Sequence, residues 1–499
     1  MPRPADRRQG GLCRKGRSLA VGSLAVGMAL SAGGCSTGQG GSPAPAVQAG
    51  RTLGPLALGV NVAAWDGAYS STGAATINDR LRAAGLRLLR YPGGSWADEY
   101  DWSTNTDTSA CVGPVTASCT STDPLGFDAF SAQARAAGAS SFVTVNYGSG
   151  TPIQAADWVS HAKSTEGNAV VLWEVGNESY SCHETNDHLA QPPSSVQGYR
   201  PGGPVCPTTA VMAGSYALHS LPYLKAMKHA DPSARIGVPW AFTKAEAAGS
   251  AVTDARSWND KVLRADSPDV NFVDAHWYPF GSVSDVTGQQ ILDSVRRIPA
   301  VAAAMRATLE RLAPNVAIVV GETNISNQAT TLDFQPVAAL FAAATSLEWL
   351  SQGAESVDWW DLNNFGSPGG GDFGLLSSGS PEAEPAGDPL PPYFGEQLAS
   401  MLTSPGSRLT PLGTGKPTLL GFRSDRNGGR RVLLINTDPG HPVTITPSWF
   451  RNGSTIETAT YGASTAASPS PIVYSTTPSD SPFPLPAQSM VVLSGTPRP

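Results

Sequence analysis

Two glutamates follow apolar, β-type runs in this sequence. The run 171–175 leads through glycine and asparagine into Glu178, and the run 316–320 leads through glycine into Glu322. A strand that ends on an acid places its carboxyl group at the mouth of a parallel barrel, where such barrels carry their catalytic residues. Two carboxyl groups aimed at one atom are what retaining cleavage of a glycosidic bond requires. The pattern therefore predicts Glu178 as general acid and base and Glu322 as nucleophile.

Taken singly, a glutamate after a strand is more often a surface or loop acid. The pair favours catalysis because the two runs would be the fourth and seventh strands of a barrel, which face each other across its mouth. Carboxyl groups on those strand ends can meet at about 5–5.5 Å, the separation typical of retention. Glu174, inside the first run, is either a buried paired acid or a residue facing the helices.

Three further residues would stand close to the two glutamates. Asn177, beside the predicted acid, could bind a sugar 2-hydroxyl group, and Tyr278 could reach Glu322 and orient it. His276 lies in the same turn as Tyr278 and would contact the substrate or the acid. The structural alternative for His276 is a core histidine whose ring nitrogens are satisfied.

Arg90, Asn146 and Trp360 complete the candidate binding residues, and each has a structural alternative. Arg90 could bind substrate, but it could also hold a carboxylate such as Glu322 ionised, and we favour that second role. Asn146 is either a ligand contact or a loop cap. Trp360, which follows the eighth apolar run, either lines a sugar subsite or packs in the core.

The elements that must position these residues alternate between β-type and helical patterns over residues 53–405. Such alternation predicts an α/β fold, a (β/α)8 TIM barrel with parallel strands. The eight predicted strands are 56–64, 86–91, 141–146, 170–176, 234–239, 270–275, 316–320 and 356–360. Helical patterns are expected at about 76–84, 125–137, 152–162, 209–229, 289–312, 334–350 and 392–402.

The pattern changes in the last part of the chain, residues 406–499. Short β-type runs separated by Gly, Pro, Asn and Ser indicate an antiparallel β-sandwich domain without helices. The runs are 418–422, 431–436, 442–446 and 490–494. Chain that precedes the first barrel strand could join this domain.

Residues 1–35 have the pattern of an export signal. Basic residues precede an apolar stretch, 19–32, that is too short for a stable membrane anchor. Ala-Gly-Gly-Cys35 resembles a bacterial lipobox, so either Cys35 carries a lipid, the one membrane attachment expected, or the leader is cleaved and the protein released. Residues 36–52, rich in Gly, Ser, Pro and Ala, form a flexible linker. The expected location is extracellular or at the cell surface.

Four cysteines follow the leader: Cys111, Cys119, Cys182 and Cys206. An even number in an exported protein favours two disulfide bonds. The short spacings suggest that Cys111 pairs with Cys119 and Cys182 with Cys206. A metal site is the weaker interpretation, because no Cys-x-x-Cys or paired histidine spacing accompanies them.

Composition narrows the classes of function. The 499 residues suffice for one large domain and one smaller domain. A net charge of -7 and a charged fraction of 15% argue against a nucleic-acid partner, which needs a basic surface. The expected partner is a carbohydrate substrate. No cofactor and no metal are expected, because two carboxylates suffice for the predicted chemistry.

Five motifs at the predicted strand ends carry a family resemblance. They are LRYPGG at 89–94, VNYGSGT at 145–151, WEVGNES at 173–179, HWYPF at 276–280 and VVGET at 319–323. Together they resemble the glycosidase clan with a (β/α)8 barrel and glutamates on strands four and seven, most closely the α-L-arabinofuranosidases of glycoside hydrolase family 51. The resemblance covers about residues 55–404.

The resemblance implies roles for individual residues. Glu178 would be the acid and base and Glu322 the nucleophile, and the sugar-contacting positions would be Asn146, Asn177 and Tyr278. Trp360 would match the strand-eight tryptophan of the clan.

The chain also departs from the family pattern. Tyr91 stands where the family usually has Trp, the fourth strand differs, and the cysteine-bearing loops and the leader are atypical. The open alternatives are a β-glycosidase of the same clan, acting on xylosides, glucosides or glucuronides, and a non-catalytic carbohydrate-binding surface lipoprotein. A third is an adhesion or scaffold protein that uses mainly residues 406–499.

Overall fold

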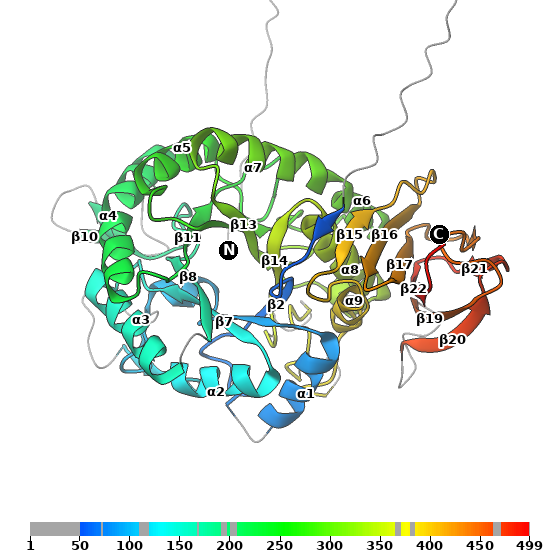
Figure 1. Cartoon of the computed structure of the whole chain (residues 1–499). Helices are drawn as coiled ribbons and strands as arrows, with labels where there is room; N and C mark the ends of the chain where they lie inside the picture. The colour runs from blue at the N-terminus through cyan, green and yellow to red at the C-terminus, as the bar shows by residue number, and fades with distance from the viewer. Residues whose placement is uncertain are drawn as a thin grey trace, which may run out of the picture. The chain divides into compact units, whose positions relative to one another are not determined.

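A closed barrel of eight parallel strands forms the centre of the chain (Figure 1). The computed structural model describes residues 50–70, 73–108, 119–166, 169–190, 197–199, 207–364, 371–379, 385–462 and 471–498. The barrel strands are β2 (Leu58–Asn61), β3 (Leu88–Tyr91), β7 (Ser140–Val145), β8 (Val170–Val175), β11 (Ile236–Trp240), β12 (Phe272–Trp277), β13 (Ala317–Thr323) and β14 (Ala354–Trp359). Pairing of β14 with β2 closes the ring. All eight predicted strands, and the predicted fold class, are confirmed.

Helices surround the strands as an outer ring (Figure 1). They are α1 (Ala74–Ala84), α2 (Phe127–Ala137), α3 (Pro152–Glu166), α4 (Thr209–Ala230), α5 (Ala255–Asp266), α6 (Gly288–Ser294), α7 (Ile298–Leu312), α8 (Pro336–Ser351) and α9 (Pro391–Ser400). Helix α5 was not predicted from the sequence; its N-cap Asp254 accepts a hydrogen bond from the Ser257 backbone. The stretch predicted as one helix at 289–312 is two helices with a 3-10 turn between them, and Pro299 lies in the first turn of α7. Pro is tolerated there because that backbone N–H has no helical partner.

The inside of the barrel is built in layers, because side chains two residues apart on a strand point to the same face. An apolar layer fills the lower part of the barrel, nearer the N-terminal ends of the strands. Its strand residues are Leu88, Phe142, Leu172, Phe272 and Val319. Two residues further along each strand come Arg90, Thr144, Glu174, Asp274 and Gly321. The strands therefore carry a polar layer directly above an apolar one.

A seven-stranded antiparallel sheet forms the main part of the C-terminal region. Its strands are, in order, β1 (Arg51–Thr52), β15 (Arg408–Pro411), β16 (Leu419–Arg426), β17 (Gly429–Asn436), β22 (Ser489–Gly495), β19 (Thr455–Gly462) and β20 (Val473–Pro478). A separate two-stranded antiparallel sheet of β18 (Val443–Ile445) and β21 (Phe483–Leu485) packs on it through a separate apolar core. The strand β1 precedes the first barrel strand and pairs with β15, as the sequence suggested. The predicted β-sandwich is confirmed, although β15, β19, β20 and β21 were not foreseen.

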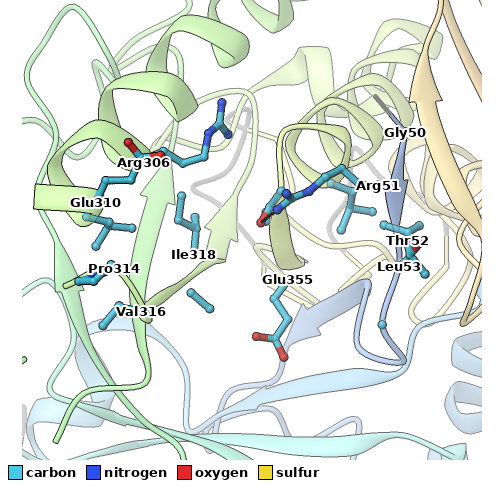
Figure 2. A pocket seen from close by; sticks show the side chains of 16 residues that line it. Gly50, Arg51, Thr52, Leu53, Arg306, Glu310, Pro314, Val316, Ile318 and Glu355 are labelled. Carbon is cyan, nitrogen blue, oxygen red and sulfur yellow. Dashed lines mark hydrogen bonds between the residues drawn. The ribbon is translucent and has the colours of Figure 1, made fainter. Parts of the chain in front are cut away.

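A pocket of about 550 Å³ lies at the N-terminal end of the barrel strands (Figure 2). It is lined by the 50–54 segment, by α7 and by the first residues of β13 and β14. Catalytic groups of such barrels lie at the opposite, C-terminal ends of the strands. The pocket is therefore separate from the strand-end glutamates. Among the described residues, no helix combines the length and apolar character needed to cross a bilayer.

Candidate active site

Glu178 and Glu322 meet at the C-terminal ends of the barrel strands. A carboxylate oxygen of each glutamate and a ring nitrogen of His276 all lie within 4.8 Å of one another. The side chains are largely shielded, with 15% of Glu178 and 6% of Glu322 exposed. The parallel register between β12 and β13 places His276 directly beside Glu322. Two carboxyl groups this close can act on one atom between them.

The turn after β8 aims Glu178 into the mouth. Gly176 has a φ of +75°, and a Cβ at this position would lie 2.5 Å from Ser179 Oγ and 2.7 Å from Tyr147 Cβ. Only glycine fits such a position without strain. Glu178 itself has a φ of +37°, a conformation that is uncommon for residues with a side chain and that often marks a functional site.

Two side chains hold the Glu178 carboxylate. His276 Nδ1 lies 2.9 Å from Glu178 Oε1, and Ser250 Oγ donates a hydrogen bond of 2.7 Å to the same oxygen. Burial disfavours the ionised carboxyl, but the hydrogen bonds and charge of His276, with the hydroxyl of Ser250, lower the pKa of Glu178 below its usual value. Both of these partners bind the same oxygen, Oε1.

Glu322 is held from two other directions. Arg90 Nη1 donates to Glu322 Oε1 at 2.7 Å, and the Tyr278 hydroxyl donates to Oε2 at 2.7 Å. Charge-assisted hydrogen bonds of this length fix the orientation of a carboxyl group. Glu322 is thus held in one orientation from two sides, as a nucleophile must be.

Arg90 is the centre of the polar layer and is completely buried. Besides Glu322, it donates to Glu174 Oε2, Asn61 Oδ1 and Asn177 Oδ1, each at 2.9 Å. Its guanidinium group therefore lies beneath the mouth and orients the side chains that form it. Glu174 is a buried paired acid, the first of its two predicted alternatives.

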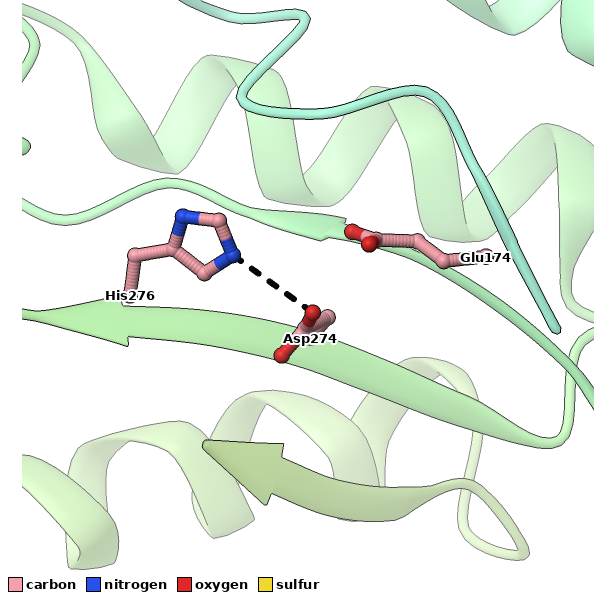
Figure 3. A group of neighbouring side chains, drawn as sticks. All are labelled: Glu174, Asp274 and His276. Carbon is pink, nitrogen blue, oxygen red and sulfur yellow. Dashed lines mark ion pairs between the residues drawn. The ribbon is translucent and has the colours of Figure 1, made fainter. Parts of the chain in front are cut away.

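Below His276, two more acids complete the cluster (Figure 3). His276 Nε2 lies 3.5 Å from Asp274 Oδ2, and Arg90 Nε lies 3.5 Å from the same oxygen. Burial and the Asp274 charge raise the pKa of Glu174 to about 8. Burial opposes the imidazolium ion, but Glu322, Asp274 and Glu178 raise the pKa of His276 well above its ordinary value. At neutral pH His276 is therefore a cation bonded to Glu178.

Two groups of ligand atoms in this region are close enough to surround a metal ion. They are Glu174, Asp274 and His276, and Glu178, His276 and Glu322. In the first group Arg90 already bonds Glu174 and lies beside Asp274, so a metal ion would have to share the space with a guanidinium cation. In the second group a metal would have to displace the Glu178 hydrogen bond of a protonated His276.

Asn177 and Asn146, two further predicted residues, lie in different surroundings. Asn177 lies at the mouth, with Oδ1 bonded to Arg90 and Nδ2 donating to Glu184 at 3.2 Å. Asn146 caps its own loop, since its Oδ1 accepts from the backbone of Ser149 and Gly150 at 2.9 Å. The Asn146 amide also donates to the Tyr100 carbonyl, away from the glutamates.

Trp360 directly follows β14 and is half-buried. Its backbone N–H donates to the Thr323 carbonyl at 3.0 Å, next to Glu322. Its ring lies against Gly94, in the turn after β3. Trp360 therefore spans the mouth between two strand ends, where it can form a wall of a sugar subsite.

Solved structures of several glycoside hydrolases are similar to this chain. The GH51 arabinofuranosidase from Xanthomonas axonopodis pv. citri is 16% identical and matches with a TM-score of 0.64 over 90% of this chain and 97% of its own. The α-L-arabinofuranosidase from Thermotoga maritima, solved with arabinose, is 15% identical with a TM-score of 0.64 over 90% and 98%. The chain shares its fold with these two structures.

A family 44 endoglucanase from Clostridium thermocellum, Cel44A, also matches, at 13% identity with a TM-score of 0.58 over 89% of this chain and 97% of its own. No family model matches the sequence, and no curated protein matches it either. The likeness to arabinofuranosidases and glucanases therefore establishes the fold alone.

The departure at Tyr91 from the arabinofuranosidase pattern does not reach the mouth. Tyr91 is completely buried, and its ring stacks on Phe130 with centroids 4.4 Å apart. Its hydroxyl group donates to the Leu125 carbonyl at 2.7 Å. This tyrosine packs between the barrel and α2.

Sequence reasoning missed several residues of the site, chiefly Ser250, Asp274 and Glu184. Asp274 could have been found, because it lies two residues before His276 on the same strand face. Ser250 and Glu184 lie in long loops, where no periodicity marks them. The predictions for Cys35, Cys111 and Cys206 fall outside the described residues. Both disulfide pairings, with Cys119 and Cys182 as partners, therefore stay predictions.

Proposed function

We propose that this protein is a retaining glycoside hydrolase that acts on α-L-arabinofuranosides. The observation that carries the proposal is the close approach of Glu178 and Glu322, whose carboxylate oxygens lie within 4.8 Å on the ends of strands four and seven. Retaining enzymes hold their two carboxyl groups about 5–5.5 Å apart, whereas inverting enzymes need about 6.5–9.5 Å. The choice of sugar is supported by the sequence motifs and by arabinofuranosidases among the similar structures.

The proposed reaction has two steps. In the first, a Glu322 oxygen bonds to the anomeric carbon while the bond to the leaving oxygen breaks. Glu178, whose pKa is low in the free site, must first take up a proton, and it gives that proton to the leaving oxygen. In the second, Glu178 removes a proton from water, the water oxygen bonds to the anomeric carbon, and Glu322 leaves as a carboxylate. Tyr278 and Arg90 keep Glu322 oriented throughout, since both donate to it.

A β-glucan or xylan hydrolase of the same fold is the second candidate. A bifunctional glucanase-xylanase, CelM2, matches at 16% identity with a TM-score of 0.61. The proposed carboxyl chemistry would be unchanged, and only the residues that contact the sugar would differ.

The first test is hydrolysis of a panel of nitrophenyl glycosides, including the α-L-arabinofuranoside, the β-xyloside and the β-glucoside. We expect release of nitrophenol from the arabinofuranoside by the wild type and none by Glu322→Ala. Turnover of another sugar would keep the mechanism and replace the substrate. Absence of turnover on the panel and on polymeric arabinan and xylan, with sugar binding retained, would favour a carbohydrate-binding protein.

Added azide would separate the roles of the two glutamates. Azide can replace a missing carboxylate and attack the anomeric carbon from the vacated side. We expect Glu178→Ala to give a glycosyl azide of retained configuration, because Glu322 still forms the covalent intermediate. Glu322→Ala should give the inverted azide, and the opposite pair of products would exchange the two roles.

A further inference from the structure

A cationic pocket lies in the C-terminal region and has no part in the proposed reaction. It has a volume of about 280 Å³ and is formed by the turn and adjoining ends of β16 and β17, the segment after α9 and the end of β22 (Figure 1). Its charged lining residues are Arg426, Arg430 and Arg431, and none of the described residues that line it is an acid. A chain with a net charge of -7 thus gathers positive charge at one place.

The register of the sheet places two arginines and two serines of the pocket on one face. Arg431 pairs with Ser424 on β16 and with Ser494 on β22, so it lies between two hydroxyl-bearing residues. Arg426 follows Ser424 by two residues, and its side chain therefore leaves the same face of the sheet. The next residue in this row, Glu457 on β19, is two strands from Arg431, about 10 Å at the usual strand spacing.

Arg426 and Arg431 are exposed, and each is anchored through one nitrogen atom. Arg426 Nε donates to the Pro405 carbonyl at 2.9 Å, and Arg431 Nη1 donates to the Met401 carbonyl, in the segment that follows α9. A guanidinium group carries five N–H donors. Among the described residues no other hydrogen bond engages either group, so most of their donors are available to a ligand.

The acid of the hairpin is used by the other two arginines. Arg430 Nε donates to Asp425 Oδ1 at 2.6 Å, and Arg423 Nε lies 3.0 Å from Asp425 Oδ2. Asp425 points away from the pocket, because it precedes Arg426 by one residue on the strand. The charges of Arg426 and Arg431 are therefore left without an acid partner among the described residues.

We propose that this pocket binds one uronic acid residue of an acidic polysaccharide, with its carboxylate on Arg426 and Arg431. The planar guanidinium group matches a carboxylate with two parallel hydrogen bonds, and the pocket's serine hydroxyl groups, such as that of Ser494, can bond the hydroxyl groups of the sugar. The volume is near the lower end of the range for ligand pockets, which suits a single residue of the polymer. The choice of a polysaccharide as the carrier of the carboxylate rests on the proposed function.

The rival explanation is that Arg426 and Arg431 only tie the hairpin to the segment after α9. Polymer binding by the intact protein separates the two. It is measured by affinity electrophoresis in gels that contain polygalacturonate, neutral arabinan or a phosphorylated mannan, at several salt concentrations. Neutral arabinan has no anionic group for the pocket, and the phosphorylated mannan offers a phosphate in place of the carboxylate.

Three double variants are compared with the wild type. Arg426→Gln/Arg431→Gln removes both charges, and Arg426→Lys/Arg431→Lys keeps the charges but loses the planar fork. Arg256→Gln/Arg264→Gln is the matched control, because it removes two exposed arginines from α5 and changes the net charge equally. Thermal unfolding of all variants is measured beside the binding, since the two anchoring hydrogen bonds are lost in the first variant.

We expect the wild type to bind polygalacturonate, and to bind it less tightly as salt rises, because the two arginines are exposed. The glutamine variant should bind at least about 10-fold more weakly, the effect of losing charge-assisted hydrogen bonds to a carboxylate. The lysine variant should lie between the two, and the α5 variant should bind like the wild type. Binding of neutral arabinan should be the same in all four proteins.

Absence of polygalacturonate binding by the wild type would overturn the proposal, as would equal binding by the glutamine variant or an equal loss in the α5 variant. Binding of the phosphorylated mannan but not of polygalacturonate would overturn the assignment to a carboxylate. If the glutamine variant does not fold, the single variants Arg426→Gln and Arg431→Gln are compared with Arg264→Gln in the same way. Failure of the proposed function has a different signature, since the wild type would then hydrolyse no glycoside whatever polymer it binds.

Discussion

The apolar and polar layers inside the barrel lie on the same strands, two residues apart, and differ in almost every physical respect. The lower layer is closed by aliphatic and aromatic side chains such as Phe142 and Phe272, whose rings meet edge to face at 5.6 Å. The upper layer holds Arg90 among Glu174, Asp274 and Glu322. The lower layer excludes water, and the upper layer holds the charged side chains.

The apolar lower layer strengthens the electrostatic interactions within the polar upper layer. The Arg90 guanidinium group lies 5.5 Å from the centre of the Phe142 ring, so its floor is apolar. Electrostatic interactions are stronger where water is excluded, and an unpaired charge there is correspondingly costly. We therefore expect substitutions in the lower layer to change stability and substitutions in the upper layer to change chemistry. Three predictions test that division, and a fourth concerns a buried acid outside the two layers.

The largest effect is expected at Glu322, which reaches the mouth from the upper layer. Removal of a covalent nucleophile typically costs several orders of magnitude, so Glu322→Ala should lower kcat at least about 10⁴-fold. The measurement is initial-rate kinetics on the best nitrophenyl glycoside, with thermal unfolding as the control for folding. Activity within tenfold of wild type would show that Glu322 is not the nucleophile.

The next comparison sets Arg90→Met against Phe142→Ala. Loss of one partner from a buried ionic cluster costs about 3–5 kcal/mol, and loss of a buried phenylalanine side chain costs about the same. The free energy of unfolding, from denaturant titration, should therefore fall similarly in both variants. Only Arg90→Met should also reduce the activity of the folded fraction, because Glu322 and Asn177 lose their common donor. Equal specific activities would contradict the division between layers.

A smaller effect, on pH dependence, is expected at His276. The protonated ring stabilises the ionised form of Glu178, which lowers the pKa of that carboxyl group. His276→Gln removes this charge, so the pKa of Glu178 should rise and Glu178 should keep its proton to higher pH. At alkaline pH, kcat/KM falls as the acid of the free enzyme loses its proton, and this fall should shift to higher pH in the variant. A fall that stays in place or shifts to lower pH would remove His276 from the control of Glu178.

The smallest effect concerns Glu396, a buried acid without a cation. Burial raises the pKa of Glu396 to about 8, while the unfolded chain releases this proton at the ordinary glutamate value. Between those values the folded state binds the extra proton, so stability falls as pH rises and levels off above pH 8. Glu396→Gln removes this dependence, so its Tm relative to wild type should increase from pH 5 to pH 8. A constant Tm difference would show that Glu396 is ionised in the folded protein.

Several features of the site were predictable because they are local. Strand ends mark Glu178, Glu322, His276 and Tyr278, since each follows an apolar run and the C-terminal ends of parallel strands share one face. Asp274 obeys the same two-residue period. Glu184 and Ser250 were not predictable, because they come from loops whose path depends on the packed barrel beneath them.

The sequence by itself determined the barrel, its eight strands and the pair of glutamates, because apolar periodicity and strand-end chemistry are properties of short segments. The tertiary structure alone decided which atoms touch. It made Arg90 a buried hub, bonded His276 to Glu178, turned Asn146 away to cap its loop, and brought Glu184 from its loop against Asn177. Hydrogen bonds and pKa values change when the distance between two groups changes by a few tenths of an ångström. The groups concerned are far apart in the sequence, so only the closed barrel sets these distances.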